Sequence, residues 1–231
     1  MKLKSPFLSL FCLLFLNSCS ILNQKADFEI ASNIYKNVSK KNIYLENSND
    51  TLRIYSKDSN NTDFTQTKPQ VFVKESNKEL FDSPMFYKNS IDVDFLTIPF
   101  KYRPKQSDFP NQFTTNLNGA IYFGNRTDVY KIKYTKDPLK KYHRNVKHYA
   151  FSFGVFTGFG GTTMNPSVTH EKINIEYDGL VWSKGVAGIM GINNFTVGLA
   201  FGFDDLLDKN RKEWIYQQKA WYGLTFGLNL N

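Results

Sequence analysis

Cysteine is scarce in this chain of 231 residues, and glycine is missing from its first half. The two cysteines are Cys12 and Cys19. Cys12 lies inside an apolar leader that we expect to be removed, so Cys19 alone would remain, which excludes an internal disulfide. All 14 glycines lie between Gly119 and Gly227. A stretch without glycine and without long apolar runs is expected to contain little tightly packed sheet.

The N-terminus has the pattern of a secretory signal peptide. A basic start precedes an apolar run at residues 6–16, which is shorter than the roughly 20 residues of a membrane-spanning helix. The next four residues, LNSC, resemble the lipobox of bacterial lipoproteins, in which the cysteine is acylated and becomes the first mature residue. We therefore expect a signal peptide at 1–18, lipidation of Cys19 and a poorly ordered, lipid-anchored tether at 19–50. An ordinary cleaved signal with an incidental cysteine is the alternative.

Bulky and small residues alternate strictly in several stretches of the C-terminal half. In NFTVGLAFGF, residues 194–203, five bulky apolar residues alternate with Thr, Gly and Ala. Alternate residues of a strand occupy opposite faces, and a face turned to water would be polar rather than glycine-rich. Bulky side chains that face lipid around a narrow interior explain the pattern. This predicts two faces: outward Phe195, Val197, Leu199 and Phe201, and inward Gly198, Ala200 and Gly202.

The same pattern predicts an all-β fold. Helical periodicity does not appear after residue 90. In one expected strand, Leu96, Ile98, Phe100 and Tyr102 should share a face. The fold class we expect is a single antiparallel up-and-down barrel of eight strands over residues 51–231, with a soluble barrel that buries its large residues as the alternative. The eight expected strands are 51–57, 70–75, 92–102, 117–134, 149–162, 172–192, 194–205 and 214–230.

Three segments resemble a known group of proteins. They are DVDFLTIPFKYRP at 92–104, NGAIYFGNRTDVYKIKY at 118–134, and the segment from EYDGLVW to the end at 176–231. Together they are similar to a family of uncharacterised secreted outer-membrane β-barrel proteins found in Bacteroidetes-type bacteria. The resemblance covers about residues 90–231 and implies residence in the outer membrane of a Gram-negative bacterium. It implies no catalytic or binding residue.

Charged residues on the expected strands and connections form two groups. Arg126 and Asp128 continue the small-residue face of the strand at 117–134, so we expect them to enter the lumen as a structural charge pair. Three more residues could join that network: Lys101, Glu176 and Lys184. The expected connection at 131–147 holds seven basic residues and one acidic residue, which favours contact with headgroup phosphates. The headgroup-contact candidates are Lys136, Lys140, Lys141, Arg144 and Lys147.

Residues for catalysis or metal binding are few. The three histidines, His143, His148 and His170, all fall in expected connections, where we predict solvated side chains, and their spacing fits no zinc motif. An acidic loop is expected at 204–208, with a calcium site as its alternative. The motif GxSxG does not occur, and nothing resembles a nucleic-acid-binding motif. We therefore predict no catalytic residue, metal, cofactor or nucleic-acid partner.

These patterns together favour a non-enzymatic outer-membrane β-barrel lipoprotein with a role in envelope structure or surface interaction. Its expected partners are the lipid bilayer and its anionic headgroups, and no protein partner is indicated. A small barrel enzyme acting on lipid or glycan is one alternative. A soluble lipid-anchored barrel that binds an apolar ligand is the other. The direction of the bulky side chains separates the membrane barrel from the soluble one.

Overall fold

The computed structural model describes residues 30–48, 50–56, 63–64, 67–77, 83–106, 109–192 and 195–228. Most of this part of the chain is antiparallel β-structure, as the alternation predicts. The expected signal peptide, Cys19 and the start of the expected tether, residues 20–29, lie outside the described residues. Neither short helix in the described ranges has the length and apolar character needed to cross a bilayer.

Twelve strands and two short 3-10 helices make up the described fold. The strands are β1 (Asn33–Asn37), β2 (Asn42–Ser48), β3 (Thr51–Ser56), β4 (Gln70–Val73), β5 (Glu75–Ser76), β6 (Met85–Arg103), β7 (Gln112–Thr114), β8 (Asn118–Lys136), β9 (Tyr142–Met164), β10 (Tyr177–Ile192), β11 (Phe195–Leu206) and β12 (Ala220–Leu228). The helices are η3 (Ser167–Thr169) and η4 (Lys209–Lys212).

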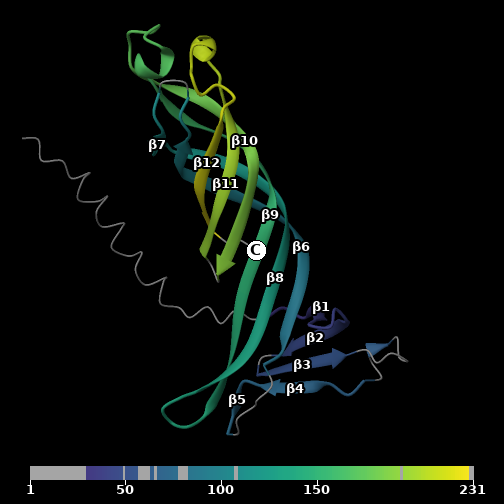
Figure 1. Ribbon diagram of the computed structural model, residues 1–231. Helices are drawn as coiled ribbons and strands as arrows, with labels where there is room; N and C mark the ends of the chain where they lie inside the picture. Colours follow the sequence, from purple (N-terminus) through teal and green to yellow (C-terminus); the bar gives the residue numbers. More distant parts are fainter. Residues whose placement is uncertain are drawn as a thin grey trace, which may run out of the picture.

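Six long strands form a closed ring of hydrogen-bonded neighbours (Figure 1). Their order is β6-β8-β9-β10-β11-β12, and β12 pairs with β6 to close the ring. Following paired residues once around the ring leads from Thr97 to Asn89, a displacement of eight residues (97 − 89). With a rise of about 3.3 Å per residue and about 4.8 Å between strands, this displacement tilts the strands by about 40°.

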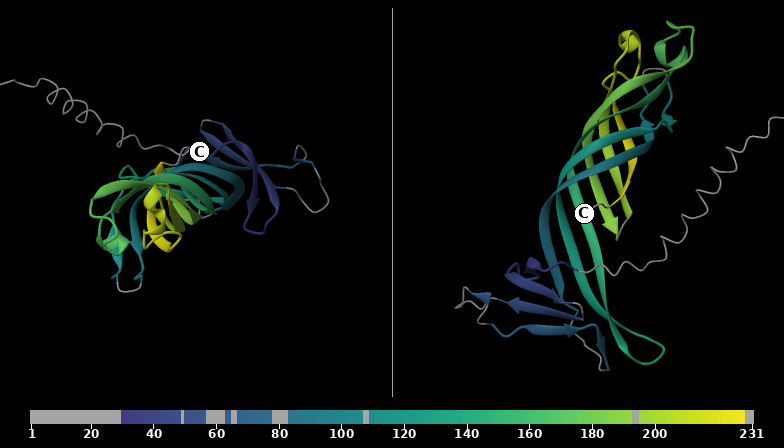
Figure 2. Two further views of the ribbon diagram at one scale, coloured as in Figure 1. Left: turned by 90° about the horizontal axis from the view of Figure 1, so that it is seen from above. Right: turned by 180° about the vertical axis from the view of Figure 1, so that it is seen from behind.

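A second group of strands lies at one end of the ring (Figures 1 and 2). The sheet continues from β6 through β1, β2 and β3 to β4, and β5 then pairs with β9. We call β1–β5, together with the ends of β6, β8 and β9 that pack on them, the lower module. Its core contains Tyr35, Leu45, Leu52, Phe72 and Ile132. The connections after β6, β9 and β11 lie at the other end of the ring.

The eight-stranded barrel is not confirmed, although the last six expected strands correspond to the six strands of the ring. The expected strands at 51–57 and 70–75 exist as β3 and β4, but they belong to the lower module. The tether expected at 19–50 is wrong for residues 33–48, which form β1 and β2. Each of these two strands buries one or two apolar side chains in a shared core, so glycine is not required for sheet here.

A β-bulge in β6 changes which residues face the interior. Phe226 pairs with Thr97 and Leu224 pairs with Phe100, so β6 has one extra residue between these pairs. Beyond the bulge, Lys101 is buried and Tyr102 is exposed. The expectation that Leu96, Ile98, Phe100 and Tyr102 share one face is therefore wrong. Pro99 lies in the bulge, where the hydrogen bond it cannot donate is not needed.

Candidate membrane-facing surface and interior charge clusters

Bulky apolar side chains lie on the outer wall of the ring. In the run at 194–203, Leu199 is 68% exposed, whereas Ala200 is 3% exposed and belongs to the core inside the ring. A Cβ atom on Gly198 would lie 2.5 Å from a backbone oxygen of β10, so no larger residue fits there. The predicted faces are confirmed for the described side chains of this run, which do not include that of Phe195.

All six ring strands contribute to this outward apolar surface. The outward side chains that are at least half exposed are Ile91, Val93, Phe95, Phe123, Phe151, Phe153, Val155, Phe159, Leu180, Leu199 and Tyr222. An exposed apolar surface that continues around a whole ring is characteristic of a membrane or protein interaction surface rather than of a surface in water.

The polarity of the exposed face of β8 changes between the ring and the lower module. In the ring part of β8, the apolar Phe123 is 50% exposed on the outside, and the charged Arg126 is buried on the inside. In the lower-module part of β8, the apolar Ile132 is fully buried and the charged Lys133 is exposed. The same face of β8 is thus buried in both parts, whereas its exposed face is apolar in the ring and polar beside the lower module.

A charge cluster fills the interior at the end of the ring opposite the lower module, and we call it the upper cluster. Asp204 is 0% exposed. Lys101 Nζ lies 3.0 Å from both of its carboxylate oxygens, and Arg103 forms a second ion pair with the same carboxylate. Ser183 donates a hydrogen bond of 2.6 Å to Asp204, and Asn118 accepts one of 2.9 Å from Lys101. Two buried cations thus share one carboxylate.

Aromatic rings surround the two cations of the upper cluster. Lys101 Nζ lies 4.4 Å from the ring centroid of Trp221. The Arg103 guanidinium lies 5.1 Å from the Trp214 ring and 5.2 Å from the Tyr216 ring. Cation–π attraction at these distances partly compensates for a positive charge without a carboxylate of its own.

A second charge cluster, the lower cluster, lies inside the ring near the lower module. Arg126 Nε donates a hydrogen bond of 2.9 Å to Asp128, and His148 Nε2 lies 2.7 Å from the same carboxylate oxygen. Arg126 also lies 3.8 Å from Asp92. The His148 ring stacks on Tyr130 with 4.5 Å between centroids. The structure thus places Arg126 and Asp128 inside the ring, and their structural role stays a prediction.

Apolar side chains fill the interior between the two clusters. They include Leu96, Tyr122, Phe156 and Trp221. Next to the lower cluster, a cavity lined by Asp92, Arg126 and Ser152 has a volume of about 10 Å³. Such a volume holds one water molecule at most. The buried polar groups of this cluster are therefore packed against one another rather than arranged around room for a substrate.

The three residues expected to join the Arg126–Asp128 network lie elsewhere. Lys101 belongs to the upper cluster. Lys184 lies on the outer wall, where it is 2.7 Å from Asp205 and 4.4 Å from the ring centroid of Trp182. Glu176 is exposed in the connection before β10.

The expected basic connection at 131–147 is the hairpin arm formed by the lower ends of β8 and β9. Arg144 is not available as a headgroup contact in this arrangement, because its guanidinium donates a hydrogen bond of 2.7 Å to the backbone oxygen of Phe72. Lys136, Lys140 and Lys141 lie at or beside the tip, and Lys141 precedes the outward Phe151 by ten residues (151 − 141). Ten residues extend about 33 Å along a strand. Lys147 is four residues from Phe151.

The histidines differ from the prediction of solvated connections. His148 is buried in the lower cluster, so the prediction is wrong for it. His143 belongs to β9, and its hydrogen bond of 2.9 Å with Asp137 lowers the pKa of that carboxyl. His170 is exposed after η3. The described ranges contain no group of three or more His, Cys, Asp or Glu residues that could hold a metal ion.

The predicted acidic loop at 204–208 is wrong for its first two residues. Asp204 is the centre of the upper cluster, and Asp205 pairs with Lys184 at the end of β11. Asp208 lies beyond the strand and caps η4, where its side chain accepts a hydrogen bond from the backbone nitrogen of Asn210.

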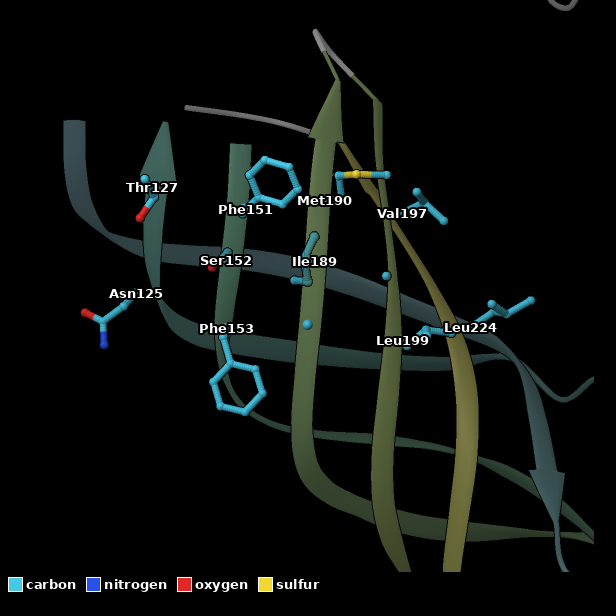
Figure 3. Close-up of a pocket in the computed structure, with 12 residues that line it drawn as sticks. Asn125, Thr127, Phe151, Ser152, Phe153, Ile189, Met190, Val197, Leu199 and Leu224 are labelled. Carbon is cyan, nitrogen blue, oxygen red and sulfur yellow. The ribbon is translucent and has the colours of Figure 1, made fainter. Parts of the chain in front are cut away.

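A groove of about 650 Å³ crosses the outer wall over β8 to β12 (Figure 3). Gly188 points outward from β10 between two large residues, because it pairs with Phe153 on one side and with Leu199 on the other. A Cβ atom on Gly188 would meet only the Phe153 ring, at 3.9 Å. The absent side chain leaves the slot between Phe151 and Phe153 on one side and Val197 and Leu199 on the other (Figure 3).

Comparison with known proteins gives no match to a protein-family model, a curated protein or a solved structure.

Proposed function

We propose that this protein is an outer-membrane β-barrel lipoprotein whose six-stranded ring spans the bilayer. The observation that carries the proposal is the change in the exposed face of β8, which presents Phe123 in the ring and Lys133 beside the lower module. A band of apolar side chains that faces outward around a whole ring is the arrangement that a hydrocarbon solvent favours. The resemblance of residues 90–231 to secreted outer-membrane barrels supports the same conclusion.

The dimensions of the ring fit this role. The outward apolar run on β9 covers residues 151–159, which is nine residues. A transmembrane strand needs about 9–11 residues. At a tilt of about 40°, nine residues rise about 23 Å, close to the apolar band of about 25 Å in outer-membrane barrels.

The proposed lipid anchor fits the same orientation. Ile30 is buried in the core of the lower module and follows Cys19 by eleven residues (30 − 19). Eleven residues span at most about 40 Å when fully extended. An acylated Cys19 would therefore insert into the leaflet next to the lower module, which would lie in the periplasm.

The two interior charge clusters support a structural rather than an enzymatic role. Each joins residues of at least two strands by buried polar contacts, as in the ion pair of Asp204 with Lys101 and the hydrogen bond of Asp128 with His148. Such contacts fix the register of a narrow barrel. We infer a non-enzymatic function in envelope structure or surface interaction, with the connections after β6, β9 and β11 at the cell surface.

Tryptophan quenching by brominated lipids tests the proposal. Trp182 lies on the outer wall, whereas Trp214 and Trp221 are buried. In vesicles that contain brominated phosphatidylcholine, a variant that retains only Trp182 should be strongly quenched, and a variant that retains only Trp221 should not. If the refolded protein stays in the aqueous phase, or if both variants are quenched equally, the proposal fails.

A further inference from the structure

A pair of lysines lies on the outer surface between the groove and the hairpin tip. Lys131 on β8 and Lys147 on β9 are directly opposite in the antiparallel register. Like charges at directly opposite positions destabilise a sheet. Neither lysine has an ion pair with an acidic side chain in the described part of the chain. The pair is therefore a small basic site to which the described residues contribute no anion.

The lysine pair and the groove lie on the same face of the same strands. On β9, Lys147, Tyr149, Phe151 and Phe153 are successive outward positions. From Lys147 to Phe151 is four residues, or about 13 Å along the strand and about 10 Å along the membrane normal. The headgroup layer on each side of the hydrocarbon core is about 5–8 Å thick. Lysine side chains that extend toward this layer would reach the phosphates of lipids whose chains lie in the groove.

We propose that the groove and the lysine pair form one binding site for a single anionic phospholipid of the leaflet next to the lower module. One acyl chain occupies the slot over Gly188, and the phosphate lies between Lys131 and Lys147. This inference rests on the proposed function, because the groove lies in the wall that would face lipid. Charge complementarity selects the occupant, since a second copy of this chain would bring the same lysine pair to the interface.

Two polar residues of β8 border the slot itself, because Asn125 pairs with Phe153 and Thr127 pairs with Phe151. They offer hydrogen-bonding groups to the glycerol and ester region of such a lipid. Asn125 and Thr127 lie on the outer face of β8 at the edge of the groove (Figure 3). Thr127 donates a hydrogen bond of 3.2 Å to Asn89 of β6, which keeps this polar edge in place. Along the outer face of β8, Thr127 at the edge of the slot is followed by Val129 and then by Lys131 of the lysine pair.

Native mass spectrometry of the mature full-length protein in mild detergent tests the site, with phosphatidylglycerol or phosphatidylcholine added. Wild type should retain one phosphatidylglycerol in preference to phosphatidylcholine. The double variant Lys131→Gln, Lys147→Gln should bind phosphatidylglycerol about 25-fold more weakly, because each lysine near an anionic headgroup contributes about a factor of five. Gly188→Phe fills the slot and should weaken the binding of both lipids.

Matched control variants separate this site from general effects. Lys136→Gln with Lys140→Gln removes the same charge at the hairpin tip, and it should leave lipid retention unchanged. Gly161→Phe adds the same side chain at another glycine with open space around its Cβ position. It should also bind lipid as wild type does.

The outcomes distinguish failure of the lipid site from failure of the proposed function. If wild type shows no lipid quenching of Trp182, the membrane function itself fails. If wild type inserts but the lysine double variant retains phosphatidylglycerol as wild type does, only the lipid site is overturned. Efficient cross-linking between copies through Leu199→Cys in vesicles would show a protein partner in the groove, and this too would overturn the lipid site.

Discussion

Leu199 offers the most direct test of which solvent surrounds the ring. It lies at the centre of the outward run at 195–203, four residues from each end. At about 3.3 Å per residue and a tilt of about 40°, it lies about 10 Å from either edge of the run, which would be close to the bilayer midplane under the proposed function. An arginine at the midplane of a barrel wall costs about 2–4 kcal/mol. Leu199→Phe should change the free energy of unfolding little, since lipid chains have no fixed shape against which a larger side chain would clash.

Val38 provides a matched control, because its side chain is 68% exposed, the same exposed fraction as that of Leu199. It lies in the turn between β1 and β2 of the lower module, where we expect water. Val38→Arg should therefore change the free energy of unfolding by no more than about 0.5 kcal/mol. Urea titration of the protein in phosphatidylcholine vesicles, followed by the gel shift of the unheated barrel, measures both variants. Equal effects at the two positions would refute the membrane assignment.

Three further predictions follow from the interior clusters and the anchor. Asp204→Ala leaves two buried cations without their carboxylate, and the same urea titration should show a loss of about 3–5 kcal/mol. His148→Leu should lower the free energy of unfolding by about 1–3 kcal/mol, because it removes a buried hydrogen bond. His143→Leu near the hairpin tip should lower it by about 0.5 kcal/mol or less. Equal losses would contradict a buried His148 and an exposed His143. Cys19→Ser should abolish labelling by a fatty-acid analogue in cells and leave the ring folded, whereas equal labelling of wild type and variant would rule out lipidation at Cys19.

The inward and outward faces of the ring strands could be predicted from the sequence, because the pattern that determines them lies within each strand. Bulky and small residues alternate with the period of a strand, and each strand carries the pattern within its own residues. The faces of β11 follow from residues 194–203 alone. The number of strands in the ring does not follow in this way, because closure depends on the pairing of β12 with β6, which are about 120 residues apart in the chain.

The lower module could not be predicted because its apolar residues are few and its pairings are distant. β1 and β2 each bury two or fewer side chains, including Tyr35 and Leu45. Their core is completed by Phe72 and Ile132 from much later segments. Short strands of this kind gain stability only in the assembled sheet, so the segment on its own resembles a polar tether.

The charge clusters could be predicted only in part from the alternation of inward and outward residues along a strand. Extending the small-residue face of β11 from Ala200 by four residues leads to Asp204, and extending that of β9 back from Ser152 by four residues leads to His148, both of which are buried. The sequence therefore contained the signal for these two residues. The alternation fails for Lys101. Lys101 is three residues after the inward Ile98, so strict alternation puts it outside, but the bulge at Pro99 turns it inside. A proline within an otherwise regular strand indicates that the alternation of faces is interrupted there. The upper cluster therefore depends on one inserted residue in β6, which brings Lys101 to the carboxylate of Asp204.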